Sequence, residues 1–233
     1  MNLRHGGYDR PMDVARKTGL EFRDLGRIGY ATAHQIQRDI HAKVLAGDAP
    51  PTVLMLEHEP VITLTRRDEA AAHLLSAPQL LRREGIEVVE TDRGGDITYH
   101  GPGQLVAYPI VPLNALRLNV RQYVAALEDA IVEALADFCV QGQRDPAGVG
   151  IWVEAQGASA KIAAIGVRVR RWVTLHGLAL NVTTNLEHFR HIVPCGLPRP
   201  VTSLRQLLGD GCPSMDHVKA ALSRALERRF LGG

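Results

Sequence analysis

A glycine-rich segment at residues 93–104 constrains the fold of this chain more than any other feature. It contains four glycines and one proline, and glycine is favoured where the backbone takes a positive φ or passes close to another group. A short strand is predicted between the glycines, with Ile97 and Tyr99 on one face and Thr98 and His100 on the other. The segment is therefore either a plain hairpin turn or a rigid turn that carries a binding site.

The polar side chains of this segment favour a binding site. Glycine and proline alone suffice to form a turn, yet this one also carries Arg93, Thr98, Tyr99, His100 and Gln104. Polar groups on a rigid turn are typical of binding sites. The segment does not match a phosphate-binding loop, because no helix is predicted directly after it and it lacks a Gly-Lys-Ser/Thr sequence.

The length and composition indicate one globular domain. The chain has 233 residues, of which 45% are hydrophobic and 22% are charged, as expected of a protein that buries a full core. We expect an N-terminal tail at residues 1–18 and a single domain at 19–233. Strands are predicted at 20–25, 52–56, 61–64, 86–91, 105–111, 149–153, 161–170 and 172–182, helices at 30–45, 78–83, 120–138, 202–208 and 215–230, and irregular structure at 189–200. This order predicts an α+β or mixed α/β fold with a mixed, largely antiparallel sheet and packed helices.

Two local signals refine this outline. Asn119 is predicted to cap the helix at 120–138, with Gln122 at the third helical position. Pro109 and Pro112 suggest that the strand at 105–111 lies at a sheet edge or contains a bulge, because proline cannot donate a hydrogen bond to a neighbouring strand.

The charge balance excludes several classes of partner. The 27 basic and 25 acidic residues give a net charge of +2, and no basic run stands apart from acidic neighbours. Neither nucleic acid nor an anionic membrane is therefore an expected partner. The sequence has no run of ~18 apolar residues and no apolar signal-peptide core, so we expect a cytoplasmic protein. Its three cysteines are expected to be free thiols.

Cys195 is the best candidate for a nucleophile among these cysteines. It lies between Pro194 and Gly196 on a stiff turn, and a reactive thiolate needs exposure and a nearby cation. Cys139 instead follows the apolar face of a predicted core helix, where a thiol is usually inert, and Cys212 lies in a loop. From the residues alone, Cys195 is either such a nucleophile or an ordinary turn residue.

Lys161 is the only lysine between positions 44 and 218, and it lies in an apolar predicted strand. A charge in such a strand is costly unless it is paired or used. An amine there can have a lowered pKa and exchange protons, which a guanidinium cannot do. The alternative is a strand-end lysine whose amine reaches the solvent along its own aliphatic chain.

Three histidines, His58, His100 and His176, interrupt apolar strands. Their spacings match no compact zinc-binding pattern, so a metal site is not expected. We interpret them as structural or substrate-orienting residues.

Taken together, these motifs resemble the lipoyl(octanoyl) transferase family. The matching segments are 93–104 (RGGDITYHGPGQ), 161–166 (KIAAIG), 176–182 (HGLALNV) and 194–196 (PCG), with further agreement at 57–61, 150–153 and 202–204. The glycine-rich segment followed by both the lysine and the Pro-Cys-Gly turn makes the resemblance specific. The chain departs from the family pattern at Thr65, where glycine is usual, and at Ala164, where serine also occurs.

The resemblance implies the catalytic fold of biotin and lipoate protein ligases. The implied activity moves an octanoyl group from octanoyl-acyl carrier protein to a lysine of lipoyl domains, which belong to 2-oxoacid dehydrogenases and the glycine cleavage H protein. Cys195 would form the acyl-enzyme, while Lys161 would lower the pKa of the thiol and move protons. The resemblance implies a monomer with no cofactor and no metal.

The resemblance also implies a set of contacts with the acyl substrate. They are Arg93, Gly94, Gly95, Asp96, Ile97, Thr98, Tyr99, His100, Ala164, Ile165, Gly166, Gly177, Leu178 and Ala179. Three alternatives compete with the transferase. An ATP-dependent lipoate or biotin ligase would need no cysteine, a cysteine-dependent thioesterase would use water as the acceptor, and an acyl-binding scaffold would leave Cys195 unacylated.

Overall fold

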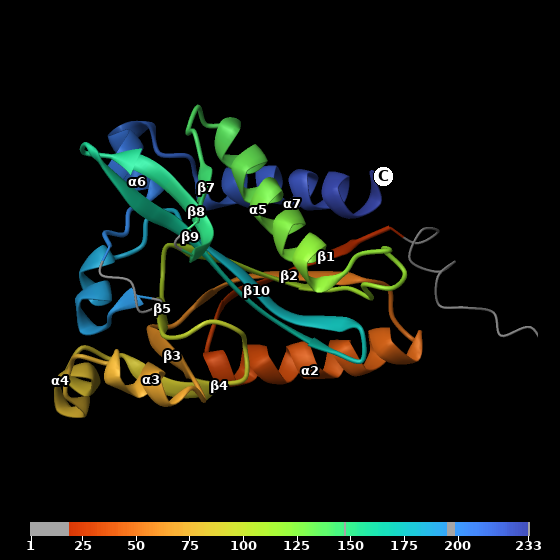
Figure 1. Cartoon of the computed structure of the whole chain (residues 1–233), viewed down its shortest axis with the longest axis horizontal. Helices are drawn as coiled ribbons and strands as arrows, with labels where there is room; N and C mark the ends of the chain where they lie inside the picture. The colour runs from red at the N-terminus through yellow and green to blue at the C-terminus, as the bar shows by residue number, and fades with distance from the viewer. Residues whose placement is uncertain (1–18, 147, 195–198, 233) are drawn as a thin grey trace, which may run out of the picture.

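A seven-stranded sheet lies at the centre of the computed structural model, which describes residues 19–146, 148–194 and 199–232. The strand order is β1-β2-β6-β10-β9-β8-β7 (Figure 1). The strands are β1 (Glu21–Ile28), β2 (Thr52–His58), β6 (Gln104–Ile110), β7 (Gln143–Asp145), β8 (Gly148–Ala155), β9 (Ala158–Arg170) and β10 (Val173–Asn181). β1 pairs in parallel with β2, and the other neighbours are antiparallel. This confirms the predicted mixed, largely antiparallel sheet.

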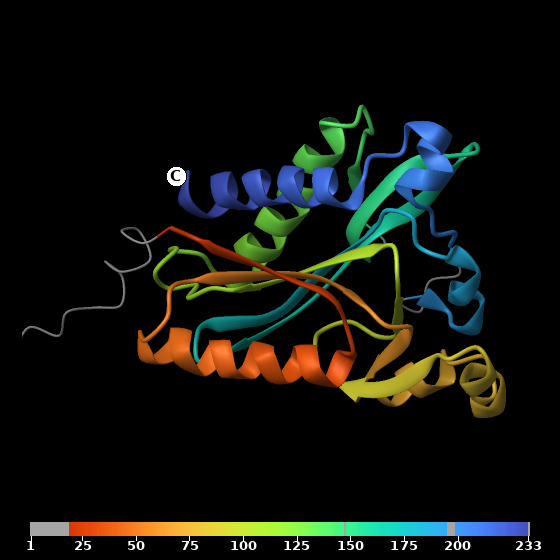
Figure 2. The same cartoon turned by 180° about the vertical axis from the view of Figure 1, so that it is seen from behind.

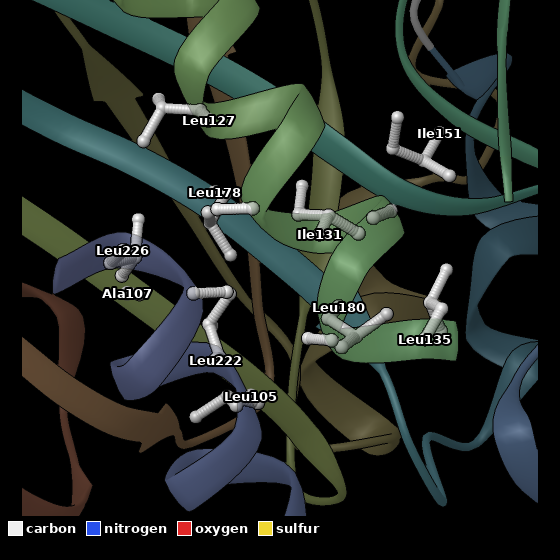
Figure 3. Close-up of a cluster of buried hydrophobic side chains, with 14 of the residues drawn as sticks. Leu105, Ala107, Leu127, Ile131, Leu135, Ile151, Leu178, Leu180, Leu222 and Leu226 are labelled. Carbon is white, nitrogen blue, oxygen red and sulfur yellow. The ribbon is translucent and has the colours of Figure 1, made fainter. Parts of the chain in front are cut away.

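Helices cover both faces of this sheet. Helix α2 (Tyr30–Ala46) lies on one face, and α5 (Val120–Ala136) and α7 (Met215–Leu231) lie on the other (Figures 1 and 2). Because side chains alternate along a strand, β6 and β10 supply both cores. Leu105, Leu178 and Leu180 pack with Leu127, Ile131 and Leu222 from α5 and α7 (Figure 3), whereas Val106, Tyr108 and Ala179 pack with Ala33 and Ile40 from α2. Burial of each large apolar side chain contributes about 1.5–3 kcal/mol.

A smaller sheet stands at one end of the molecule and holds the glycine-rich segment. Its order is β4-β3-β5, with β4 (Glu87–Thr91), β3 (Val61–Thr65) and β5 (Thr98–His100), and it is accompanied by α3 (Asp68–Ala72), α4 (Pro78–Arg83) and the 3-10 helix η1 (Leu186–His191). A short helix α6 (Leu204–Leu208) and a 3-10 turn η3 (Gly209–Gly211) precede α7. Since β5 belongs to the small sheet and β6 to the large one, the Gly-Pro-Gly turn between them joins the two sheets.

The capping prediction for α5 is confirmed. The Gln122 backbone N–H donates to Asn119 Oδ1, and the Asn119 N–H donates to Gln122 Oε1, each at 2.9 Å. This reciprocal pair satisfies two of the N–H groups that a helix start leaves without intrahelical partners.

The sequence predicted that β6 lies at a sheet edge or contains a bulge. The edge alternative is wrong, because β6 lies between β2 and β10. Pro109 is tolerated because it lies two residues beyond the last β6–β10 pair, Ala107–Leu178, where a missing N–H breaks no hydrogen bond to β10. The Thr174 hydroxyl donates to the Pro109 carbonyl at 2.7 Å instead.

Other predictions need correction or concern residues outside the described ranges. Cys139 is exposed just after α5 and is not a core thiol. Part of the segment predicted as irregular forms η1. The N-terminal tail at 1–18 and Cys195 lie outside the described residues. Among the described helices, none has the length and apolar character needed to cross a membrane.

Candidate active site

A narrow cavity of about 40 Å³ lies where the glycine-rich segment meets β9 and β10. Its walls contain most of the predicted acyl contacts, namely Arg93, Gly95, Asp96, Thr98, His100, Ala164, Ile165, Gly166, Gly177, Leu178 and Ala179. The predicted alternation along β5 is present, because Thr98 and His100 face this cavity while Ile97 and Tyr99 pack into the core of the small sheet.

The remaining predicted contacts, Gly94, Ile97 and Tyr99, do not line this cavity. The Gly94 N–H donates to the Val167 carbonyl at 2.9 Å, so this glycine holds the loop against β9. The Tyr99 hydroxyl is hydrogen-bonded to His188 Nδ1 at 2.7 Å, on the side away from the cavity wall formed by Thr98. Ile97 and Tyr99 therefore support the wall from behind.

Two glycines allow the strands around the cavity to approach one another. Gly166 of β9 pairs with Gly177 of β10. A Cβ atom at Gly166 would lie 2.8 Å from the Gly94 carbonyl oxygen, and one at Gly177 would lie 2.2 Å from the Ala107 carbonyl oxygen. Larger side chains are excluded here by backbone contacts within the protein itself.

Lys161 lines a second, smaller cavity of about 10 Å³ that shares Thr98, Ala164 and Ala179 with the first. The same small cavity is lined by Pro194, the residue before Cys195. The structure thus brings Lys161 to the described end of the Pro-Cys-Gly turn, although it does not describe Cys195 itself.

The Lys161 side chain is buried, with only 6% of its surface exposed. Its Nζ donates to the Val149 carbonyl at 3.2 Å and lies 4.8 Å from the centre of the Trp152 ring. This environment contradicts the alternative in which the amine reaches the solvent. A carbonyl and an aromatic face therefore hold this buried amine in position.

The segment that leads to Cys195 is anchored to the loop between α3 and α4. The Leu75 N–H donates to the His191 carbonyl at 2.8 Å, and the Val193 N–H donates to the His73 carbonyl at 2.9 Å. The buried His191 ring donates from Nε2 to Glu84 at 2.9 Å, and its Nδ1 is 2.7 Å from the Ser76 hydroxyl. These contacts fix the backbone just before Pro194.

A chain of buried hydrogen bonds connects the wall of the first cavity to the backbone of Lys161. His100 Nδ1 donates to Gln104 Oε1 at 2.7 Å, and Gln104 Nε2 donates to Asn181 Oδ1 at 2.9 Å. Asn181 Nδ2 donates to the Thr202 carbonyl at 3.0 Å, and the Thr202 N–H donates to the Lys161 carbonyl at 2.9 Å. A buried network whose members are bonded in this way fixes the relative positions of its side chains.

The buried histidines around the cavity are neutral at physiological pH. Burial, followed by the nearby His58, lowers the pKa of His100 to about 3, and burial with Arg93 and Arg168 lowers that of His176 to about 3. Burial also lowers the pKa of His58 to about 4. These rings therefore act as neutral hydrogen-bonding groups, as the structural or orienting interpretation expects.

Arg93 holds a positive charge at the wall of the cavity. Its Nη2 donates to both the carbonyl and the hydroxyl of Thr63, at 2.9 and 3.0 Å, and its Nη1 donates to the Gly94 carbonyl at 3.0 Å. Thr65, one of the two departures from the family pattern, donates to the Gly95 carbonyl at 3.3 Å. The other departure, Ala164, lines both cavities.

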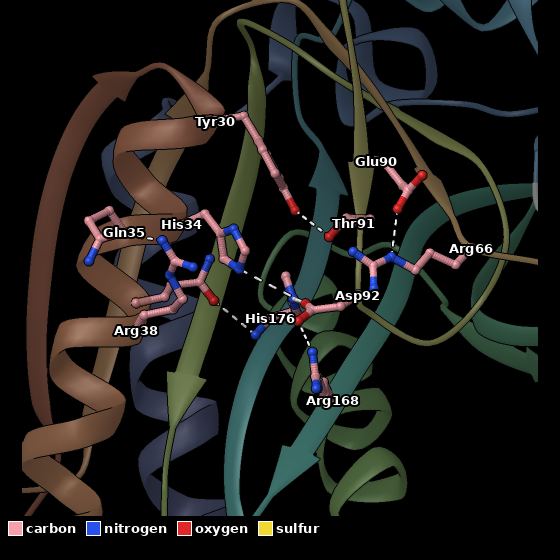
Figure 4. Close-up of polar contacts among 11 residues, drawn as sticks. Tyr30, His34, Gln35, Arg38, Arg66, Glu90, Thr91, Asp92, Arg168 and His176 are labelled. Carbon is pink, nitrogen blue, oxygen red and sulfur yellow. Dashed lines mark hydrogen bonds and ion pairs between the residues drawn. The ribbon is translucent and has the colours of Figure 1, made fainter.

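Behind His176 lies a cluster in which His34, Asp92 and His176 place their ligand atoms within 4.8 Å of one another (Figure 4). Among the described residues these three have a metal-like arrangement. However, Arg168 forms an ion pair with Asp92, so the carboxylate is already neutralised. The Arg38 side chain lies close by (Figure 4), and two guanidinium groups disfavour a divalent cation.

The comparison with known proteins assigns the family. The sequence profile of the lipoyl protein ligase A/B catalytic domain matches residues 29–227. The chain belongs to this family. Among its relatives, the octanoyltransferase of Solibacter usitatus is 47% identical over 89% of this chain and 91% of the relative. The octanoyltransferase of Gloeobacter violaceus is 45% identical over 88% of this chain and 87% of the relative.

Solved structures confirm the predicted fold. A putative lipoate protein ligase from T. acidophilum with bound lipoic acid has a TM-score of 0.70 at 17% identity, covering 91% of this chain and 86% of that one. A biotin protein ligase from Aquifex aeolicus in complex with biotin and ATP has a TM-score of 0.56 at 11% identity, covering 90% of this chain and 70% of that one. The family fold is therefore the one shared by lipoate and biotin ligases.

Sequence reasoning missed two cavity residues that the family fold brings in from other elements. Tyr30 lies at the start of α2 and Tyr108 on β6, and both line the first cavity. The Tyr108 hydroxyl is 2.7 Å from His58 Nε2. A tyrosine within an otherwise apolar strand was the available signal, since its hydroxyl needs a partner when it is buried.

Proposed function

We propose that this protein transfers an octanoyl group from octanoyl-acyl carrier protein to a lysine of a lipoyl domain, the first step of protein lipoylation. The main support is that the buried amine of Lys161 lines the same small cavity as Pro194, next to the cavity of the expected acyl contacts. The curated relatives support the same reaction, because they are octanoyltransferases and match nearly the whole chain.

In the first half-reaction, the Cys195 thiolate attacks the carbonyl carbon of the octanoyl thioester. A new C–S bond forms, the C–S bond to the carrier breaks, and the carrier leaves as a thiolate that takes up a proton from the solvent. A free cysteine has a pKa of ~8.5, so a cation beside it increases the fraction present as thiolate. Lys161, held by Val149 and Trp152, would supply that cation.

In the second half-reaction, the amine of the acceptor lysine attacks the acyl-enzyme. A C–N bond forms while the C–S bond to Cys195 breaks, and the attacking nitrogen loses a proton. Once acylation has removed the neighbouring thiolate charge, the Lys161 ammonium would release its proton to the solvent, and the neutral amine can then accept the proton of the attacking nitrogen, because an amine exchanges protons whereas a guanidinium does not. The products are an octanoyl amide on the acceptor and the regenerated Cys195 thiolate beside the Lys161 ammonium.

The first cavity would hold the octanoyl chain. Ala164 and Ala179 line both cavities, and Ile165 and Leu178 border the first, although the Leu178 side chain packs against α5 and α7. The chain would therefore enter from the Lys161 side, and backbone N–H groups near the glycines would stabilise the developing oxyanion. Tyr30 and Tyr108 are further from Lys161 along this path, since they line only the first cavity.

The reaction needs no ATP, metal or organic cofactor, because the conversion of a thioester to an amide is downhill. We propose that the acceptors are lipoyl domains of 2-oxoacid dehydrogenases and the glycine cleavage H protein, and that the enzyme acts as a cytoplasmic monomer. The fold alone does not distinguish transfer from ATP-dependent ligation, since the fold neighbours are ligases.

A transfer assay distinguishes the candidate reactions. The protein is incubated with octanoyl-carrier protein and a lipoyl domain, with and without ATP, and the lipoyl domain is followed by intact mass. We expect one octanoyl group on the acceptor without ATP, and none on an acceptor whose target lysine is replaced by arginine. A strict requirement for ATP would indicate a ligase, and release of free octanoate despite the acceptor would indicate a thioesterase.

A further inference from the structure

A separate cavity of about 240 Å³ lies between α2 and the β9–β10 hairpin. Arginines from both sides line it: Arg38 comes from α2, Arg168 and Arg170 from β9, and Arg171 from the hairpin turn. Asp92 is the acidic residue in its wall. The cavity is distinct from the two acyl cavities, since neither of these is lined by any of the four arginines.

The positive charge of this cavity is largely unbalanced. Arg168 pairs with Asp92 (Figure 4), and that ion pair accounts for one arginine and the carboxylate. Arg38 donates a hydrogen bond to the neutral amide of Gln35. Within the described ranges, no carboxylate lies at ion-pair distance from Arg38, Arg170 or Arg171. Three positive charges in one cavity therefore lack a counter-charge.

The two histidines of the cavity fit this positive environment. Burial, followed by His176, Arg38 and Arg168, lowers the pKa of His34 to about 4. Burial is also the main cause of the lowered pKa of His41, whose Nε2 donates to the Arg170 carbonyl at 3.2 Å. Both rings are neutral at pH 7 and add hydrogen-bonding capacity without charge, while the His41 bond fixes the hairpin against α2.

We propose that this cavity binds a small polyanion of the diphosphate class. Guanidinium groups bind phosphate oxygens with paired N–H donors, and one phosphate monoester carries a charge of about −1.5 to −2 at pH 7. A single carboxylate would balance only one of the three unpaired arginines, whereas a diphosphate matches them more closely. Arg38, Arg170 and Arg171 are exposed, so the ligand can reach them without a rearrangement of the fold.

The chain offers a matched control for testing this site. Arg82 and Arg83 are also adjacent, exposed arginines, at the end of α4, and they line none of the cavities described above. The double variants Arg170→Gln/Arg171→Gln and Arg82→Gln/Arg83→Gln therefore change the net charge equally. Arg38→Gln tests the same cavity from α2 and leaves the hairpin unaltered.

Isothermal titration of the full-length protein with inorganic pyrophosphate, at constant ionic strength and pH 7.5, tests the proposal. We expect saturable binding of pyrophosphate to the wild type and to Arg82→Gln/Arg83→Gln, the α4 variant. Binding to Arg170→Gln/Arg171→Gln, the hairpin variant, and to Arg38→Gln should be at least ~10-fold weaker. Circular dichroism establishes that each variant is folded. The proposal fails if the wild type shows no saturable binding, or if the hairpin and α4 variants lose affinity equally. Because the titration needs no acyl substrate, its outcome is independent of the proposed transferase activity.

Discussion

Replacing Lys161 by arginine or by methionine separates its charge from its ability to move a proton. Arginine remains cationic at every working pH but does not release a proton. Methionine keeps an unbranched side chain and loses both the charge and the N–H donors. Lys161→Arg should therefore still stabilise the Cys195 thiolate and fail in proton transfer from the acceptor lysine, whereas Lys161→Met should fail in both.

The surroundings of Lys161 set the size of these effects. Its amine donates a hydrogen bond to the Val149 carbonyl at 3.2 Å and lies over the Trp152 ring, and a hydrogen bond from a charged group contributes about 1.5–3 kcal/mol. Lys161→Met should lower the free energy of unfolding by about 1.5 kcal/mol or more, because these contacts are lost while the aliphatic part of the side chain is kept. Loss of a general acid–base residue slows a reaction by about 10²–10⁴-fold, well beyond the effect of such a change on the folded fraction.

Rapid-quench measurements of the two half-reactions between pH 6 and 9 distinguish the roles of Lys161. In Lys161→Arg, we expect acylation to stay near the wild-type rate and octanoyl transfer to slow by about 10²-fold or more. In Lys161→Met, acylation should also slow. Its rate should come closer to the wild-type rate as the pH approaches ~8.5, the pKa of a free cysteine thiol. Near-wild-type transfer by Lys161→Arg would rule out proton transfer by Lys161, and near-wild-type rates in both variants would remove it from the mechanism.

Three further predictions concern packing, pH and the acyl cavity. Gly177→Ala should lower the melting temperature strongly, since its Cβ would lie 2.2 Å from a carbonyl oxygen of β6, whereas Gly211→Ala, with nothing within 4 Å, should have little effect. Equal melting temperatures would contradict the packing. The unfolding free energy should be constant above pH ~7.5 and fall by about 2 kcal/mol per histidine at pH 5, because the folded pKa values of His100 and His176, about 3, lie below the unfolded value of ~6.5. Chemical denaturation at each pH measures this, and a flat profile would contradict the burial of neutral rings. Ala179→Leu should reduce octanoyl transfer more than butanoyl transfer by filling the cavity, and an equal loss for both chains would contradict its position along the acyl path.

The sequence predicted those parts of the fold that depend on local patterns. The capped helix α5 and the alternation of Ile97, Thr98, Tyr99 and His100 follow from residue spacing, and both are present. The position of β6 inside the sheet was not predictable from Pro109, because it depends on where the pairing with β10 ends. Local pattern decides which face a side chain takes, and tertiary pairing decides its neighbours.

The candidate site was only partly accessible from sequence for the same reason. Lys161 and Pro194 are 33 positions apart in the sequence, and their common cavity results from the pairing of β9 with the segment around Val201. Tyr30 and Tyr108 reach the first cavity from α2 and β6, which no local pattern links. The arginine cavity likewise combines two elements more than a hundred residues apart.

Intact mass spectrometry after incubation with octanoyl-carrier protein, without ATP and without an acceptor, tests whether Cys195 forms an acyl-enzyme. We expect the addition of one octanoyl group, its release by hydroxylamine, and its localisation to Cys195 by peptide mapping. A Cys195→Ser variant should give no hydroxylamine-labile thioester, while Cys139→Ser should behave like the wild type. An octanoyl group on Cys139 or Cys212, or no covalent adduct on the folded wild-type protein, would contradict the acyl-enzyme mechanism.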